Sequence, residues 1–484
     1  MSRQRGTGFL TNVSANLSIG ASALGYSVIV PAVVVRRFGD EVYGSWYLAF
    51  QVAAYIVLLD LGSQYLVTNE ASAPSPGSRP ARLATAAMAL QTALALAVLC
   101  GAAAWAAFTG QARLAQLMVV LGMAGVASLL ASTVRAWFVG LRRAHVAAAW
   151  LVGARVGSVT GLAVAVALDA GLVPLTVAVA APQLVIHAGL LLWARRPPSP
   201  WARPDRAALA RLVRSTAPLA VWTGCGIVIS GVDIFIVRAV DLSEVGRYAV
   251  ALPLLAIPTG AVTAFMTAWL PRVARAQAVP GGARAMTSSG TTLMAAALAM
   301  GALAFIGYAD VLVDLLAGPG QWATAASYLR VLYAAVCLRF VFLPWAILIV
   351  VRGDQRAIVL APIVEGVTNL VASVVLGLWL GAIGVALGTL AGAAAAAVVY
   401  LTYGVRRTSR SDVTARDLLT AVRGAGIPVT VAVIITALAL GGAPTILFGV
   451  AAATALVMNG WWLAGPGRTL MSLPQASMET ATEP

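Results

Sequence analysis

Two arginines that lie deep inside long apolar stretches are the residues of this sequence best suited to chemistry. Arg155 and Arg339 lie roughly 15 and 18 Å along the helices that those stretches would form, at the rise of an α-helix. A charge at the centre of a bilayer costs at least about 2.5–3.5 kcal/mol, so such a residue faces a water-filled cavity or a partner. Because a guanidinium group pairs two oxygen atoms at once, both arginines are suited to hold a phosphate or pyrophosphate. A buried ion pair, or a side chain that reaches the headgroups, is the alternative for both.

Three further polar residues extend this candidate substrate-binding set. Arg135 is shallower than Arg155 and can also reach an interface. Asn12 and Asn16 lie four residues apart, so they share one face of a helix. Such a stripe either lines a cavity or forms hydrogen bonds between helices. The candidates for a substrate cavity are therefore Arg155, Arg339, Arg135, Asn12 and Asn16.

Acidic residues within the apolar stretches form a second candidate set, which consists of Asp60, Asp233 and Glu365 together with Asn369. In a transporter, such groups can bind H⁺ or Na⁺ and couple its movement to turnover. They can equally be the counter-charges that allow arginines to lie in the membrane. Glu365, Asn369 and Ser373 recur at every fourth position and share a helix face. The sequence leaves ion coupling and charge balance open as alternatives.

The composition indicates which kind of structure holds these residues. Of the 484 residues, 60% are hydrophobic and 10% are charged, whereas soluble domains carry roughly 25% charged residues. Apolar runs of roughly 18 residues or more recur along the whole chain, and each can cross a bilayer as a helix. The sequence therefore predicts an all-α polytopic membrane protein.

The apolar runs predict about fourteen transmembrane helices. They lie near 9–35, 43–68, 83–108, 113–139, 146–168, 171–194, 209–237, 245–270, 287–309, 323–350, 357–380, 382–404, 418–440 and 444–464. All 32 basic residues are arginines, and they lie mainly in the short segments between these runs. Loops rich in arginine alternate with loops that hold few arginines and most of the loop acids. This alternation places both termini in the cytoplasm, and it argues against a nucleic-acid partner despite the net charge of +15.

Weak internal repeats divide the chain into two halves. The sequence GLRRAHVA at 140–147 resembles GDQRAIVL at 353–360, and RRFGDEVYGSWY at 36–47 resembles RAVDLSEVGRYA at 238–249. The segment Arg195–Pro204 lies between the halves, and its prolines oppose a helix. We therefore expect an N-terminal six-helix bundle at 1–200, a C-terminal six-helix bundle at 205–405, two additional helices at 415–465 and a cytoplasmic tail at 466–484.

Little in the sequence supports catalysis. The expected outer loops are short, whereas membrane enzymes of glycan assembly usually carry a sizeable outer loop with acids or a base. The chain has no lysine, so it lacks the phosphate-binding glycine motif that ends in lysine. His145 and His187 are its two histidines, which leaves little to build a zinc or haem site. We expect a protein that is not an enzyme and binds no metal or cofactor.

Short motifs in both halves follow one another in a recognisable order. The first half combines the polar start at Asn12 and Asn16 with Pro31, Phe38-Gly39, Tyr43-Gly44-Ser45-Trp46 and Leu58-Leu59-Asp60-Leu61-Gly62. The second half contains Pro271, then Glu365-Gly366-Val367-Thr368-Asn369 and Gly384-Val385-Ala386-Leu387-Gly388-Thr389. Over about residues 8–405, this order resembles the oligosaccharide flippases of the multidrug/oligosaccharidyl-lipid/polysaccharide exporter superfamily.

The resemblance implies two helix bundles in a V around a central cavity that opens first to the cytoplasm. It implies that an oligosaccharide on an isoprenoid pyrophosphate carrier moves by alternating access from the inner to the outer leaflet of the bacterial cytoplasmic (inner) membrane. The product would serve the synthesis of O-antigen and thus lipopolysaccharide, of capsule or of exopolysaccharide. The implied partners are this lipid-linked oligosaccharide, membrane lipids and polysaccharide polymerase or assembly proteins. Relatives with a cationic cavity hold the pyrophosphate there, which fits Arg155 and Arg339, while Asp60 and Glu365 match family positions by motif.

Other functions share this fold or these residues. A lipid II flippase of the same superfamily often has about two helices beyond the family core, as this chain is expected to have. A cation-coupled multidrug exporter would share the fold but would favour acids and aromatic residues for cationic drugs. Outside transport, a membrane scaffold of a glycan-assembly complex would carry its buried charges for structure alone. The opening motif and the arginine-rich interior favour the glycan flippase.

Overall fold

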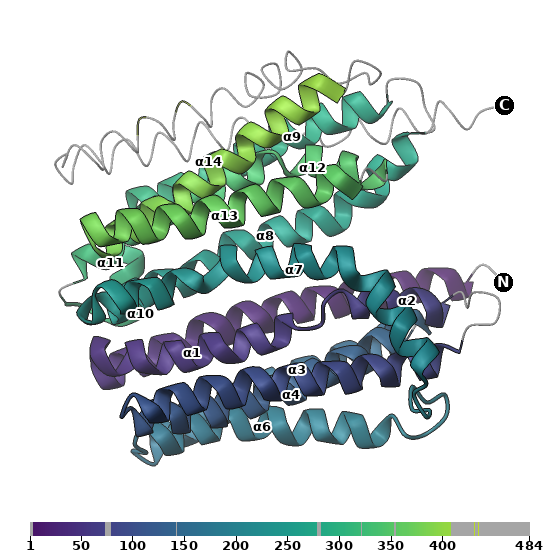
Figure 1. Ribbon diagram of the computed structural model, residues 1–484, viewed down its shortest axis with the longest axis horizontal. Coiled ribbons are helices and arrows are strands. Elements are labelled where there is room, and N and C mark those ends of the chain that lie inside the picture. The colour runs from purple at the N-terminus through teal and green to yellow at the C-terminus, as the bar shows by residue number, and fades with distance from the viewer. Residues whose placement is uncertain are drawn as a thin grey trace. The chain divides into compact units, whose positions relative to one another are not determined.

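The described part of the chain is helical throughout its regular structure (Figure 1). The computed structural model describes residues 3–72, 79–141, 143–277, 282–320, 322–352 and 355–407, and also the single positions 430 and 434. Among these residues, 10 helices are long and apolar enough to cross a membrane, or up to 11 if a bent pair is one span. The chain is thus a multi-pass membrane protein.

The expected number of spans is not fully represented in the described residues. The helices predicted at 418–440 and 444–464, and the tail at 466–484, lie outside them, apart from positions 430 and 434. The helical stretch Ser18–Ser72 is 55 residues long, whereas about 20 residues span a bilayer. It is interrupted at Gly39, where φ is 77° and ψ is 177°. This stretch is therefore long enough for both of the first two predicted spans.

Residues 1–227 form a first compact unit, called unit 1. Its helices are α1 (Arg3–Leu58), α2 (Ser63–Ser72), α3 (Pro80–Phe108), α4 (Ala112–Gly140), α5 (Ala144–Ala167), α6 (Leu172–Trp193) and the first part of α7 (Arg206–Val240). Helix α4 packs against α1, α3 and α6, and Figure 1 shows α3, α4 and α6 running alongside one another. Val134, Ala136 and Trp137 of α4 lie in a buried apolar cluster with Met88 and Leu190. Polar side chains on this part of α4 are therefore set among apolar neighbours.

Residues 228–484 form a second compact unit, called unit 2. Its described helices are the rest of α7, the 3₁₀ turn η1 (Leu242–Glu244), α8 (Val245–Ala276), α9 (Gly282–Ala302), the π-helical turn η2 (Leu303–Gly307), α10 (Ala309–Ala317), α11 (Ala323–Val341), α12 (Leu343–Val351), α13 (Gln355–Leu380) and α14 (Ala382–Arg407). Glycines bring α13 and α14 together. A Cβ atom at Gly388 would lie 2.3 Å from the backbone nitrogen of Ser373, and one at Gly384 would lie 2.0 Å from the carbonyl oxygen of Leu376. Small residues at every fourth position allow this direct packing of two backbones.

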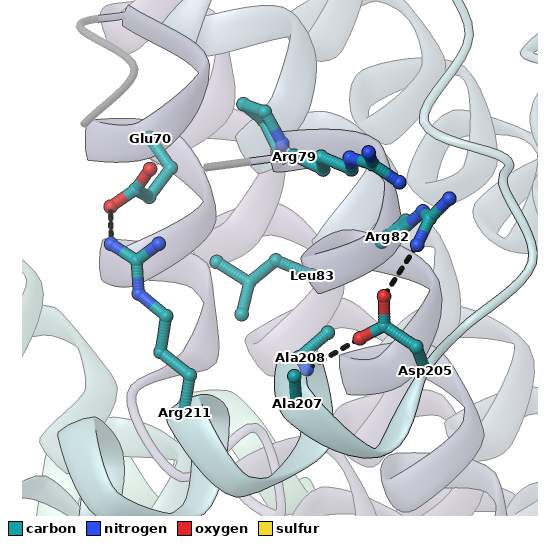
Figure 2. Close-up of a pocket in the computed structure, with 9 residues that line it drawn as sticks. Glu70, Arg79, Arg82, Leu83, Asp205, Ala207, Ala208 and Arg211 are labelled. Atoms are coloured by element: carbon teal, nitrogen blue, oxygen red, sulfur yellow. Dashed lines mark hydrogen bonds and ion pairs between the residues drawn. The ribbon is translucent and has the colours of Figure 1, made fainter. Parts of the chain in front are cut away.

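The units divide between residues 227 and 228, inside α7, and not in the segment 195–204, which contains no helix. Ion pairs explain why the start of α7 belongs to unit 1. Nη1 of Arg82 lies 2.6 Å from Oδ2 of Asp205, and Arg211 pairs with Glu70 (Figure 2). Unit 1 therefore includes the beginning of a helix that the sequence analysis assigned to the second bundle.

Candidate functional site

Arg155 of α5 lies against α1, where its guanidinium group is held by two oxygen atoms. Its Nη1 donates to the carbonyl oxygen of Ile19 at 2.8 Å and to Oγ of Ser22 at 3.1 Å. The side chain is half-buried, and it forms no ion pair with any residue that the structure describes. Asn12 and Asn16 lie earlier on α1, and their side chains are outside the described part of the structure. The charge of Arg155 is therefore positioned by α1 but not neutralised there.

Arg135 of α4 and His187 of α6 belong to the same group of polar side chains. Nη1 of Arg135 is buried and has no hydrogen-bond partner among the described residues. His187 is 1% exposed, and within the same part of the chain neither Nδ1 nor Nε2 has a partner. His187 lies within electrostatic range of both Arg135 and Arg155, and Arg135 lies within electrostatic range of Arg155. We call Arg135, Arg155 and His187 the Arg–His cluster.

In the Arg–His cluster, Nη1 of Arg135 and both ring nitrogens of His187 lack a hydrogen-bond partner among the described residues, whereas Arg155 has two acceptors on α1. An unsatisfied buried polar group costs about 1–3 kcal/mol, and a charged group costs more. In the described ranges, Arg135 has no carboxylate partner either. Guanidinium and imidazole N–H groups are the kind of donors that bind the oxygen atoms of an anion. The cluster is therefore chemically suited to a phosphate or pyrophosphate group.

Five groups that carry oxygen atoms converge in unit 2. Thr389 Oγ1 donates to Oδ2 of Asp233 at 2.5 Å, and Ser373 Oγ donates to Oδ1 of Asn369 at 2.8 Å. Ser373 Oγ also lies 3.1 Å from the carbonyl oxygen of Val385, and Thr389 Oγ1 lies 3.5 Å from Oδ1 of Asn369. We call Asp233, Asn369, Ser373, Thr389 and the carbonyl of Val385 the oxygen cluster.

The oxygen cluster is buried and incompletely satisfied. Asp233 is 4% exposed and Asn369 is 0% exposed. The hydroxyl of Tyr248 donates to Oδ2 of Asp233 at 3.3 Å, whereas Oδ1 of Asp233 has no partner among the described residues. A carboxylate oxygen beside amide, hydroxyl and carbonyl oxygens is a donor set for a hard cation. Over the described ranges, no three His, Cys, Asp or Glu side chains group as a metal site would require.

Arg339 of α11 and Glu365 of α13 form an ion pair, with 2.5 Å between Nε and Oε1. Their side chains are 20% and 8% exposed. For Arg339 the structure thus shows the buried ion pair that the sequence analysis gave as the alternative to a phosphate contact. The charge of Arg339 also acts on Asp233, so the ion pair lies within electrostatic range of the oxygen cluster.

Replacing Arg339 alone with methionine is expected to destabilise the protein strongly, because Glu365 would remain buried without its counter-charge. Breaking one partner of a buried pair costs about 3–5 kcal/mol, whereas exchanging both partners for apolar residues is often nearly neutral. Thermal unfolding of the purified Arg339→Met variant should show this loss, and the Arg339→Met/Glu365→Leu double variant should recover most of it. A double variant as unstable as the single one would show that the pair does not account for the effect.

Asp60 lies at the break between α1 and α2. Its Oδ1 accepts the backbone N–H of Gly62 at 3.4 Å. Leu61 and Gly62 have positive φ angles of 50° and 78°, a conformation that a side-chain acceptor helps to hold. In this structure Asp60 therefore supports a turn in the second predicted span.

Several residues at these sites are not evident as site residues from the sequence alone. The sequence does offer a signal for His187, which is a polar residue inside an apolar run. Ser22 and Tyr248 carry no such signal, because their roles depend on how one helix is rotated against another. Thr389 lay within a family motif, but its contact with Asp233 joins residues far apart in the chain.

The sequence matches the family described as Polysaccharide biosynthesis protein over residues 9–277, which is more than half of the chain. No curated protein matches the sequence significantly.

Several solved transporters share the fold. The lipid II flippase MurJ, in an inward closed conformation, superposes with a TM-score of 0.72 over 96% of this chain and 100% of that chain, at 10% identity. A MOP superfamily transporter from Pyrococcus furiosus Vc1 gives a TM-score of 0.57 over 81% of this chain and 94% of that chain, at 16% identity. A eukaryotic MATE transporter gives 0.55 over 86% of this chain and 100% of that chain, at 13% identity. At such low identities the likeness shows a common fold.

Proposed function

Since the chain belongs to the polysaccharide biosynthesis protein family and has the fold of membrane transporters, we propose that it is a flippase for a lipid-linked oligosaccharide. The oligosaccharide is carried on an isoprenoid pyrophosphate and moves by alternating access from the inner to the outer leaflet of a bacterial cytoplasmic membrane. The product serves the assembly of O-antigen, lipopolysaccharide or exopolysaccharide by polymerase and assembly proteins. The Arg–His cluster is the observation that carries this proposal.

The Arg–His cluster can bind a pyrophosphate through side chains from three helices. Arg135, Arg155 and His187 belong to α4, α5 and α6, and none of the described carboxylates neutralises the two arginines. A pyrophosphate offers several oxygen atoms and more than one negative charge, which matches two guanidinium forks. By helical periodicity, positions 12 and 16 share the face of Ile19, whose carbonyl oxygen holds Arg155. We therefore assign Asn12 and Asn16 to the same substrate-binding site.

We assign ion coupling to the oxygen cluster, with Asp233 and Asn369 as its central residues. A Na⁺ ion or a proton at Oδ1 of Asp233 would supply the partner that this atom lacks. Glu365 does not belong to this site, because it balances Arg339. Asp233 lies on α7, which belongs in part to each unit. A cation bound there would act on the helix that connects the units.

The flippase proposal is tested by measuring lipid-linked glycan in each membrane leaflet of a strain that lacks the protein. We expect undecaprenyl-type pyrophosphate glycan to accumulate on the cytoplasmic side and to return to normal when the wild-type chain is restored. Accumulation of lipid II would instead assign a lipid II flippase. A normal glycan pool with new drug sensitivity would assign a multidrug exporter, and either outcome would refute the proposal.

The proposed orientation places both termini and the segment 195–204 in the cytoplasm. In a chain whose native cysteines are replaced, Arg196→Cys should react with a membrane-impermeant maleimide only after the membrane is opened. Thr109→Cys should react in intact spheroplasts, since both positions are exposed and lie on opposite sides in this topology. The cysteine-free chain is the control, because native Cys100 is exposed. Labelling of Arg196→Cys in intact spheroplasts would reverse the orientation.

A further inference from the structure

A pocket of about 360 Å³ lies in unit 1 where α2 ends and α3 and α7 begin (Figure 2). Its walls carry the arginines Arg79, Arg82 and Arg211 and the carboxylates Glu70 and Asp205. Three arginines against two carboxylates leave one excess positive charge. The pocket is thus a basic recess at one end of the helices of unit 1.

Both carboxylates of the pocket are occupied by other groups. Glu70 pairs with Arg211, and Asp205 pairs with Arg82 (Figure 2). Oδ1 of Asp205 also accepts the backbone N–H of Ala208 at 2.7 Å and so caps the first turn of α7. This N–H, followed by Arg82, holds the pKa of Asp205 below its usual value. The two acids therefore fix the walls of the pocket through their ion pairs.

Arg79 supplies the excess charge. Its side chain is exposed, its charge acts on Asp205 at longer range than the ion pair of Arg82, and the neighbouring sequence 73–78 contains no acid. The side chains of Arg82 and Arg211 remain 35% and 40% exposed despite their ion pairs. A guanidinium group has five N–H donors, more than one carboxylate can use. The three arginines can therefore act together on one further anion.

We propose that this pocket binds the phosphate of an anionic membrane lipid, with Arg79 as the principal contact and Arg82 and Arg211 beside it. The pocket lies at the ends of apolar helices, and such ends reach the headgroup level of a bilayer. Basic recesses between helix ends are suited to acidic headgroups. Pro80 in the same wall is half-buried and offers apolar contact to the glycerol and upper acyl chain. In the proposed orientation the lipid belongs to the cytoplasmic leaflet.

The binding is tested by native mass spectrometry of the purified full-length chain, titrated with phosphatidylglycerol and, separately, with zwitterionic phosphatidylcholine. Arg79→Gln removes the excess charge and leaves both ion pairs in place. Arg203→Gln is the matched control, because it removes an exposed arginine that does not line the pocket. We expect Arg79→Gln to weaken phosphatidylglycerol binding about fivefold, the effect of one basic residue at a lipid surface. Arg203→Gln should leave it unchanged.

Two outcomes would overturn the lipid assignment. Equal weakening by Arg79→Gln and Arg203→Gln, or equal affinity for the two lipids, would mean that general charge attraction explains the binding. A second arm adds inorganic phosphate and pyrophosphate at millimolar concentration. If these free anions displace the lipid, and if Arg79→Gln weakens their binding as much as it weakens lipid binding, the pocket is a site for a soluble anion. Retention of phosphatidylglycerol in their presence supports the proposal.

Discussion

Replacing Arg155 with methionine is expected to lower the flipping of lipid-linked glycan at least about tenfold, while the protein stays in the membrane near its wild-type amount. Methionine keeps an unbranched apolar stem but removes the guanidinium group and its charge. A hydrogen bond to a charged group contributes about 1.5–3 kcal/mol, and each 1.4 kcal/mol corresponds to about a factor of ten. In the proposed site, Arg155 can form two such bonds to a pyrophosphate. The leaflet-resolved glycan pool of a complemented deletion strain measures the loss.

Three matched variants separate substrate binding by Arg155 from a structural role. Arg155→Lys keeps the charge and loses the planar fork, so it should retain intermediate activity. Ser22→Ala removes one of the two contacts that hold Arg155 but leaves its charge, so activity should stay close to wild type. Arg113→Gln removes an exposed arginine outside the cluster and should have no effect. A fully active Arg155→Met variant at normal abundance would refute the anion site and favour the scaffold function.

The positions of most helices could be predicted from the sequence, because apolar runs separated by turn-forming residues define them. The spans predicted at 357–380 and 382–404 correspond to α13 and α14, and Gly381, with φ at 68°, separates them. The breaks inside predicted spans could not be predicted. The turn at Asp60–Gly62 requires a positive φ at Leu61, and α11 and α12 are divided at Phe342 within one apolar run. Hydropathy is insensitive to such local changes of backbone.

The sequence also identified most of the polar residues at the sites, but not how they pair. Arg339 and Glu365 were both selected, yet whether they were partners depended on the rotation of α11 against α13. The oxygen cluster depends in the same way on α14, whose glycines set Thr389 next to Asn369 and Asp233. One sequence indicates that a buried charge needs a partner, whereas only the packing of the helices identifies that partner. The division of unit 1 from unit 2 inside α7 has a similar origin, since it follows from ion pairs between distant segments.

Replacing Asp233 with asparagine is expected to remove the response of the protein to the proposed coupling cation. In the wild-type protein, Na⁺ at constant ionic strength should raise the thermal unfolding temperature relative to choline, because a ligand that binds the folded state stabilises it. A ligand at about 100 times its Kd contributes about 2.7 kcal/mol. Asp233→Asn keeps the shape of the side chain and removes its negative charge. The rise in unfolding temperature with Na⁺ should therefore disappear. Transport in the complemented deletion strain should fall with it.

The control for Asp233 is a buried hydroxyl of unit 2 that lies outside the oxygen cluster. Thr291 is 0% exposed and donates to the carbonyl oxygen of Thr287 in its own helix, so Thr291→Val should lower stability without changing the Na⁺ response. Thr389→Val removes a hydroxyl next to Asp233 and should weaken the response. A Na⁺ response that persists in Asp233→Asn would place the cation elsewhere. If the wild-type protein shows no Na⁺ response but its transport depends on pH and is lost in Asp233→Asn, the coupling ion is a proton at the same carboxylate.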